Sequence, residues 1–233
     1  MLGAVFGLVP SILPVSWLTA LLIGTVGVLL VRGWRLRVVL TAFVVAEVSG
    51  LPWPVAPLLA AACFFAFTPG SLRRLVRQRG CTSGRRAAWF LVVLVSVAAG
   101  TAVVALDWTT IRSGYTFAFP VPPPWSFPLV ALGAALVNAL GEEALWRGVL
   151  SDVGAPVLRL RAAVCLQSFS FGLAHFHGIP NGVLGVVAAA VYSALVYGIS
   201  MRLGARGALV AHLLTDLVIF VVVVHFAQFA WSG

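Results

Sequence analysis

The chain has 233 residues, of which 61% are hydrophobic and only 9% are charged. A soluble domain carries about a quarter charged residues, so this composition excludes an ordinary soluble enzyme and indicates an integral membrane protein. The net charge of +9 is carried by 15 arginines, with no lysine. These arginines fall mostly in short loops between apolar runs, where positive charge marks the cytoplasmic side of a membrane rather than a nucleic-acid site.

Uncharged apolar runs, bounded by arginine clusters and Pro/Gly turns, predict the membrane spans in chain order. The predicted spans are residues 11–31, 38–49, 53–70, 87–106, 128–150, 162–177, 183–201 and 207–230. The stretch 107–127 contains "FPVPPPWSFP", which is too rich in proline for a helix and is expected to be a loop. The predicted fold class is therefore all-α, a polytopic transmembrane helix bundle of about eight spans.

Arginine clusters alternate regularly with these spans, because two spans lie between each cluster and the next. The clusters are residues 32–37, 73–86, 159–161 and 202–206. If all of them face the cytoplasm, both termini and the proline-rich loop lie outside, in agreement with the positive-inside bias. We expect residues 1–124 to hold N-terminal transmembrane spans and this external loop, and residues 125–233 to form a second unit.

The predicted span 128–150 contains Glu142, Glu143 and Arg147 within an apolar run. An ionisable side chain near the bilayer centre costs about 2.5–3.5 kcal/mol on insertion scales, so such residues usually mark a functional interior. Glu143 and Arg147 are four residues apart and should form an ion pair on one helix face. Glu142 points about 100° away, which leaves it outside that ion pair and suited to accept a proton. The alternative is that all three form one structural cluster.

Two later spans carry histidines on defined helix faces. His175 follows Phe171 by four residues, so the phenyl ring can pack under the imidazole. His177 lies on roughly the opposite face, and both histidines cannot enter one site. His212 and Asp216 are also four residues apart, and a carboxylate there can hold the imidazole in one tautomer. The span between these two motifs has no charged residue and is expected to be scaffold.

Polar groups on three separate spans therefore predict one convergent site inside the membrane. The groups supply a carboxylate, two imidazoles and a second carboxylate. Such a set suits hydrolysis, because it provides a base for water and stabilising groups for a tetrahedral oxyanion. Each group alone would be a weak signal, but together they favour an intramembrane hydrolase.

Three short motifs carry a resemblance to a known family. "EEALWR" matches EExxxR, "FGLAH" matches FxxxH and "HLLTD" matches HxxxN/D. In this order on successive apolar spans, they resemble the CPBP family of CAAX proteases and bacteriocin-processing enzymes, also called ABI. The resemblance covers about residues 125–225, so residues 125–233 are expected to be a CPBP-like catalytic transmembrane core. In the first motif, Glu143 and Arg147 match the structural pair.

The resemblance implies an intramembrane endopeptidase similar to the type II CAAX prenyl endopeptidase. By this resemblance, Glu142 is the general base that activates water and His175 is its partner. His212 and Asp216 then lie at the oxyanion side. Asp216 stands where the prenyl endopeptidases have Asn, and an ionised Asp cannot donate a hydrogen bond. Asp216 would then orient His212 or bind a metal instead of touching the oxyanion.

A divalent metal such as zinc is a further expectation of the resemblance, because family members are described both as metalloproteases and as glutamate proteases. Glu142, His175 and His212 would then provide a ligand set of two histidines and one glutamate with an open position. The expected substrate is a peptide or a membrane-protein precursor within the lipid bilayer. The use of arginine alone is typical of GC-rich codons and favours a bacterial cell membrane, with the active-site cavity reached from the cytoplasmic side.

Other classes of intramembrane protease fit less well. The sequence lacks the HExxH of zinc site-2 proteases, the GxGD of aspartyl intramembrane proteases and the GxSG of rhomboids. Cys63, Cys81 and Cys165 show no paired or metal-like spacing. The main alternative is a membrane immunity or interaction protein that retains the site without catalysis, and a small transporter is a further one.

Overall fold

The computed structural model describes residues 55–68, 85–106, 124–150, 159–176 and 178–230, with shorter pieces at 34, 37–38, 41–42, 44–45, 70–71, 73 and 108. The regular secondary structure of these residues is helical throughout, which confirms the predicted all-α class for this part of the chain. The elements are α4 (Val55–Phe67), α6 (Arg85–Leu106), the 3-10 turn η2 (Pro124–Ser126), α8 (Phe127–Glu142), η3 (Glu143–Leu150), α10 (Leu160–Ala174) and α11 (Gly182–Ala230).

Three helices in the described residues are long and apolar enough to cross a membrane, namely Arg86–Leu106 in α6, Phe127–Leu150 across α8 and η3, and Gly182–Val223 in α11. Two shorter apolar stretches accompany them, Pro57–Ala66 in α4 and Leu160–Ala174 in α10. This set agrees with an integral membrane protein. The prediction of about eight spans is not confirmed, since residues 11–31 and most of 38–49 lie outside the described residues.

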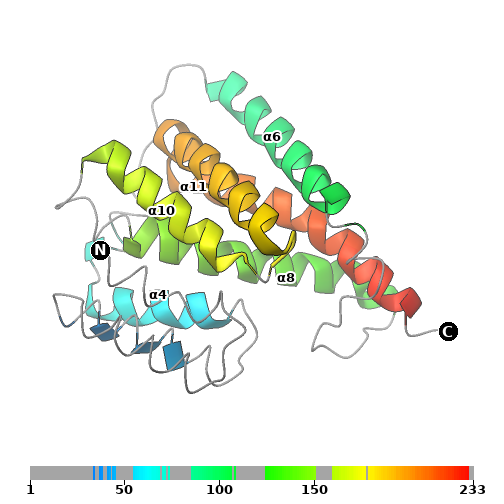
Figure 1. Ribbon diagram of the computed structural model, residues 1–233, viewed down its shortest axis with the longest axis horizontal. Helices are drawn as coiled ribbons and strands as arrows, with labels where there is room; N and C mark the ends of the chain where they lie inside the picture. The colour runs from blue at the N-terminus through cyan, green and yellow to red at the C-terminus, as the bar shows by residue number, and fades with distance from the viewer. Residues whose placement is uncertain are drawn as a thin grey trace.

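α11 reverses direction at Gly204, whose φ of 74° and ψ of −173° lie in a region that favours glycine. The hydroxyl of Tyr192, before the turn, donates to the hydroxyl oxygen of Thr215, after it, at 2.9 Å. α11 therefore consists of two arms, residues 182–203 and 205–230, that fold back on each other (Figure 1). The two arms correspond to the last two predicted spans.

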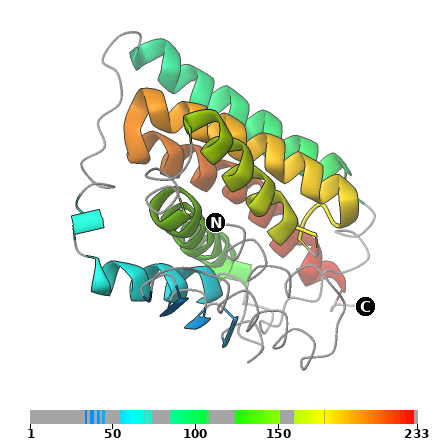
Figure 2. The same ribbon diagram turned by 60° about the vertical axis from the view of Figure 1, so that its left-hand side comes forward.

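α4 and α6 lie on opposite sides of the molecule, with α8, α10 and α11 between them (Figure 1 and Figure 2). α6 packs along α11 so closely that a Cβ at Gly100 would lie 2.8 Å from the Cβ of Val218. Ser96 Oγ also donates to the carbonyl of Ala211 at 2.9 Å. These contacts fix α6 against the second arm of α11, which carries the third motif.

A buried aromatic pair connects the first motif to the second. Trp146 in η3 and Phe171 in α10 are almost fully buried, and their ring centroids lie 5.2 Å apart in an edge-to-face arrangement. Trp146 Nε1 donates to Ser170 Oγ at 3.2 Å, so the polar atom of this large side chain is satisfied. The pair therefore holds η3 and α10 in a fixed relation beside the site.

The segment Glu143–Leu150 differs from the expected α-helix, because it is a π-helix. A π-helix has i→i+5 hydrogen bonds, and single π-helical turns occur frequently at functional sites. The predicted span 128–150 is therefore helical over its whole length, but its helix type changes at Glu143. The change of helix type begins directly after Glu142, between the two adjacent glutamates.

Candidate active site

Glu142 is the last residue of α8 and is completely buried. Its Oε2 lies 3.2 Å from His212 Nε2 and 3.9 Å from His175 Nε2. One carboxylate oxygen thus faces both imidazoles, although the three side chains come from α8, the end of α10 and the second arm of α11. The structure therefore brings together the three motifs that the sequence analysis expected to converge.

The ring of His175, directly after α10, is oriented by a backbone contact. Nδ1 donates to the carbonyl of Phe171 at 2.8 Å, and because a carbonyl can only accept, Nδ1 carries a proton. In the neutral imidazole, the Nε2 atom that faces Glu142 is then an acceptor. The phenyl ring of Phe171 packs against the imidazole, with 4.4 Å between the centroids, as the four-residue spacing predicts. His177 lies outside the described residues.

Glu143 contacts two partners through one oxygen. Its Oε1 lies 3.0 Å from Arg147 NH1, an ion pair at the four-residue spacing. The same Oε1 accepts a hydrogen bond from His212 Nδ1 at 2.7 Å, which fixes Nδ1 as a protonated nitrogen. From the sequence, Asp216 is expected to orient this imidazole. In the structure, Glu143 makes the short hydrogen bond and Asp216 faces the other ring nitrogen.

Asp216 lies on the Nε2 side of His212. Its Oδ1 is 3.6 Å from Nε2, which is too long for a hydrogen bond, and its Oδ2 accepts a hydrogen bond from Asn138 Nδ2 at 3.0 Å. Asn138 is a site residue that the sequence analysis missed. The available signal was an amide inside an apolar span, four residues before Glu142 and so on the same face of α8.

Buried Arg147 is tied to two further helices by a polar network. Its NH2 donates to the carbonyl and hydroxyl oxygens of Ser193, at 3.2 and 3.0 Å. Gln167 Nε2 donates to the same hydroxyl at 2.9 Å. The guanidinium carbon also lies 4.9 Å from the ring centroid of Phe171, within range of a cation–π contact. The span expected to be scaffold thus supplies Ser193, a neutral residue that a search for charges overlooks.

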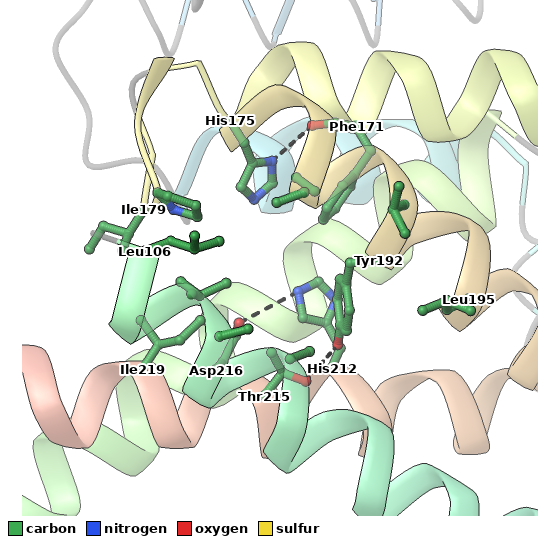
Figure 3. A pocket seen from close by; sticks show the side chains of 17 residues that line it. Leu106, Phe171, His175, Ile179, Tyr192, Leu195, His212, Thr215, Asp216 and Ile219 are labelled. Atoms are coloured by element: carbon green, nitrogen blue, oxygen red, sulfur yellow. Dashed lines mark hydrogen bonds and ion pairs between the residues drawn. The ribbon is translucent and has the colours of Figure 1, made fainter. Parts of the chain in front are cut away.

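A cavity of about 180 Å³ lies beside the two histidines (Figure 3). The polar side chains on its wall are His175, Tyr192, His212, Thr215 and Asp216. The remaining lining is apolar, and the part contributed by α6 consists of Ala99, Ala102, Val103 and Leu106. Glu142 contacts both histidines but does not itself line this cavity. His175, His212 and Asp216 therefore face a mostly apolar space that a substrate side chain can enter (Figure 3).

No three histidine, cysteine, aspartate or glutamate side chains in the part of the chain that the structure describes are arranged to hold a metal ion. Glu142, His175 and His212 are the set predicted for zinc, and their donor types suit that metal. Zinc binding by these three side chains stays a prediction, with Glu142 Oε2 3.2 Å from His212 Nε2 and 3.9 Å from His175 Nε2.

Residues 124–227 match the family model described as Type II CAAX prenyl endopeptidase Rce1-like, which confirms the expected family. Comparisons with curated proteins and with solved structures find no match. The matched segment covers η2, α8, η3, α10 and most of α11, and it contains all the polar residues of the site described above. α6 lies outside the matched segment, so one apolar wall of the cavity comes from beyond it.

Proposed function

Because residues 124–227 belong to the type II CAAX prenyl endopeptidase Rce1-like family, we propose that the chain is an intramembrane endopeptidase in which Glu142 and His175 activate water for attack on a peptide bond. The observation that carries this proposal is the proximity of Glu142 Oε2 to the Nε2 atoms of His175 and His212. A carboxylate in contact with two imidazoles that line a cavity, in a bundle that includes helices apolar enough to cross a membrane, suits acid–base hydrolysis.

Water activation follows from the hydrogen-bonding capacity of the two facing atoms. The 3.9 Å between Glu142 Oε2 and His175 Nε2 is too long for a direct hydrogen bond, and a water beside the line that joins the two atoms would contact both. Both atoms are acceptors when His175 is neutral with its proton on Nδ1. A water between them would donate one O–H to each atom and keep a lone pair for the substrate carbonyl carbon.

The proton released by this attack has a defined route. The water oxygen bonds to the carbonyl carbon while one water proton moves to Glu142. The same proton then passes to the nitrogen of the departing amine as the C–N bond breaks, which returns Glu142 to its carboxylate form. Glu142 thus acts first as a general base and then as a general acid.

His212 is proposed to stabilise the negative charge that develops on the substrate oxygen. Its Nδ1 donates to Glu143, and its Nε2 faces Glu142 and Asp216. When Nε2 also carries a proton, the ring is an imidazolium that faces the carboxylates of Glu142, Glu143 and Asp216. The Nε2–H of this imidazolium would donate to the oxyanion, a role that ionised Asp216 cannot take because it has no proton to donate.

The cavity favours a substrate with one bulky apolar side chain near the cleaved bond. Its volume of about 180 Å³ is close to the roughly 150 Å³ of an apolar cavity that admits benzene, and below the roughly 300–1,000 Å³ of pockets for drug-sized ligands. We therefore propose a peptide or membrane-protein substrate that approaches from the lipid bilayer, without a required prenyl group. The arginine clusters favour access from the cytoplasmic side of a bacterial cell membrane.

A second form of the same proposal includes a bound divalent metal such as zinc. If Glu142, His175 and His212 bind zinc, protein purified in detergent should contain about one zinc per chain, and His212→Ala should lose it. Zinc that persists in His212→Ala would contradict this ligand set. An absence of zinc from both proteins, with cleavage retained by the wild type, would favour water held by Glu142 and His175 alone.

The competing function is a membrane immunity or interaction protein that keeps the site without catalysis. The test compares membrane proteomes of the source cell carrying wild-type, Glu142→Gln or Val137→Leu protein. Glu142→Gln removes the base with almost no change of shape, whereas Val137 lies on an exposed face of the same helix and serves as the matched control. A precursor that accumulates only with Glu142→Gln supports the protease. Identical processing in all cells at equal protein levels contradicts it.

A further inference from the structure

The hydrogen bond from Asn138 to Asp216 joins α8 to the second arm of α11 at the edge of the site. Nδ2 donates to Oδ2 at 3.0 Å, and the two residues are only 8% and 6% exposed. A buried carboxylate is costly unless its oxygens are hydrogen-bonded, so the amide stabilises Asp216 in this place. The bond also fixes which carboxylate oxygen is left to face His212.

Asn138 is linked through Asp216 to the atoms proposed for catalysis. Asp216 Oδ1 lies 3.6 Å from His212 Nε2, and Glu142 Oε2 lies 3.2 Å from the same nitrogen. Asn138 precedes Glu142 by one helical turn, so both side chains project from one face of α8. A displacement of Asp216 would therefore alter the charge around His212 Nε2 without any change in Glu142 itself.

We propose that Asn138 is a positioning residue for the cleavage reaction: its amide orients Asp216, and Asp216 in turn sets the charge beside His212 Nε2. The proposal rests on the endopeptidase function proposed above. Asp216 stands where the motif of the prenyl endopeptidases has Asn. An ionised Asp216 offers no N–H, and in this chain the amide of the pair comes from position 138 instead.

The exchange of the two side chains separates a positioning role from a purely structural one. Asn138→Asp alone places two carboxylates about 3 Å apart and removes the donor, so kcat should fall by about 100-fold or more. The double variant Asn138→Asp/Asp216→Asn restores one amide and one carboxylate, with Asn at 216 as in the prenyl endopeptidases. It should recover kcat at least about tenfold relative to Asn138→Asp, with KM changed little throughout.

Two further variants complete the experiment. Asn138→Leu replaces the amide by an apolar side chain of similar size and so removes the donor. It should lower kcat by about 10- to 100-fold, the loss typical of a hydrogen bond to a charged group. Val137→Leu, on an exposed face of the same helix, should keep wild-type kcat, KM and Tm. All variants are purified in the same detergent and assayed on one cleaved substrate, with Tm measured in parallel.

The proposal is overturned if Asn138→Leu keeps wild-type kcat, or if the exchanged double variant is no more active than Asn138→Asp at equal Tm. Glu142→Gln is assayed beside them to test the cleavage mechanism separately. If Glu142→Gln cleaves as fast as the wild type, the proposed mechanism fails. The Tm values of Asn138→Asp, Asp216→Asn and the double variant then still test whether Asn138 and Asp216 interact. Additive Tm changes among these variants would show that Asn138 and Asp216 do not interact.

Discussion

Glu143 Oε1 lies 2.7 Å from His212 Nδ1, and this hydrogen bond joins residues that are 69 positions apart in the chain. The same oxygen lies 3.0 Å from Arg147 NH1, and Arg147 continues to Ser193 on the first arm of α11. The imidazole proposed for oxyanion stabilisation is therefore connected through one glutamate to a buried guanidinium. Glu143 both links the helices of the site and orients the ring of His212.

Glu143→Gln should destabilise the protein strongly, because it removes the negative partner of buried Arg147. The loss of one partner of a buried ion pair costs about 3–5 kcal/mol, so the free energy of unfolding in detergent should fall by that order. Arg202→Gln changes an exposed arginine near the turn of α11 and should alter the same quantity by less than about 0.5 kcal/mol. Equal Tm values for Glu143→Gln and the wild type would contradict the structural role of Glu143.

His175→Ala should lower turnover with little loss of stability. The His175 side chain lines the cavity, so its removal enlarges an existing space instead of opening a new one inside the core. Acid–base groups commonly contribute about 10²–10⁴-fold to the rate. We expect kcat to fall by at least about 100-fold at an unchanged Tm. His225→Ala, an exposed histidine on α11, is the matched control and should keep wild-type kcat. A kcat for His175→Ala within a few-fold of wild type would exclude the proposed role.

Ala99→Leu should narrow the cavity from the side of α6. Substrates with a bulky apolar residue near the cleaved bond should lose at least about tenfold in kcat/KM, while substrates with alanine there should keep theirs, because the added side chain occupies the space. Val97→Leu, exposed on the same helix, is the control. The outcome is read from a peptide library graded by side-chain volume, and an unchanged preference would show that this cavity does not receive the substrate.

Reporter fusions test the predicted topology, which concerns residues outside the described ranges. A fusion at residue 80, within the arginine-rich cluster, should read as cytoplasmic, and one at residue 118, in the proline-rich loop, should read as external. The two sites flank a single predicted span, so they must lie on opposite sides. The reverse pattern would place the arginine clusters outside and remove the argument for access from the cytoplasm.

Local contacts of the site could be predicted from the sequence. The four-residue spacing of Glu143 with Arg147, and of Phe171 with His175, predicts contacts that the structure contains. Such contacts depend on a single helical turn, so the spacing alone determines which side chains meet. The convergence of the motifs was also predictable, because charged groups in apolar helices must find polar partners away from lipid.

Contacts between distant helices could not be predicted in the same way. The hydrogen bond of Glu143 to His212, in place of Asp216, depends on how η3 and α11 pack. The change to a π-helix at Glu143 was not predicted from the spacing of the motif either. Asn138 and Ser193 escaped attention because a neutral polar residue in an apolar run is common. Only the position of its partner shows whether such a residue belongs to a site.

The central claim is that Glu142 is the base that activates water. The most direct test is to measure kcat of purified Glu142→Gln on a substrate identified in the proteome comparison. The amide is almost isosteric with the carboxylate but cannot accept the proton of water. We predict a fall in kcat of at least about 100-fold, with KM and Tm close to those of the wild type and of Val137→Leu. A Glu142→Gln protein that cleaves the substrate at the wild-type rate would contradict the account.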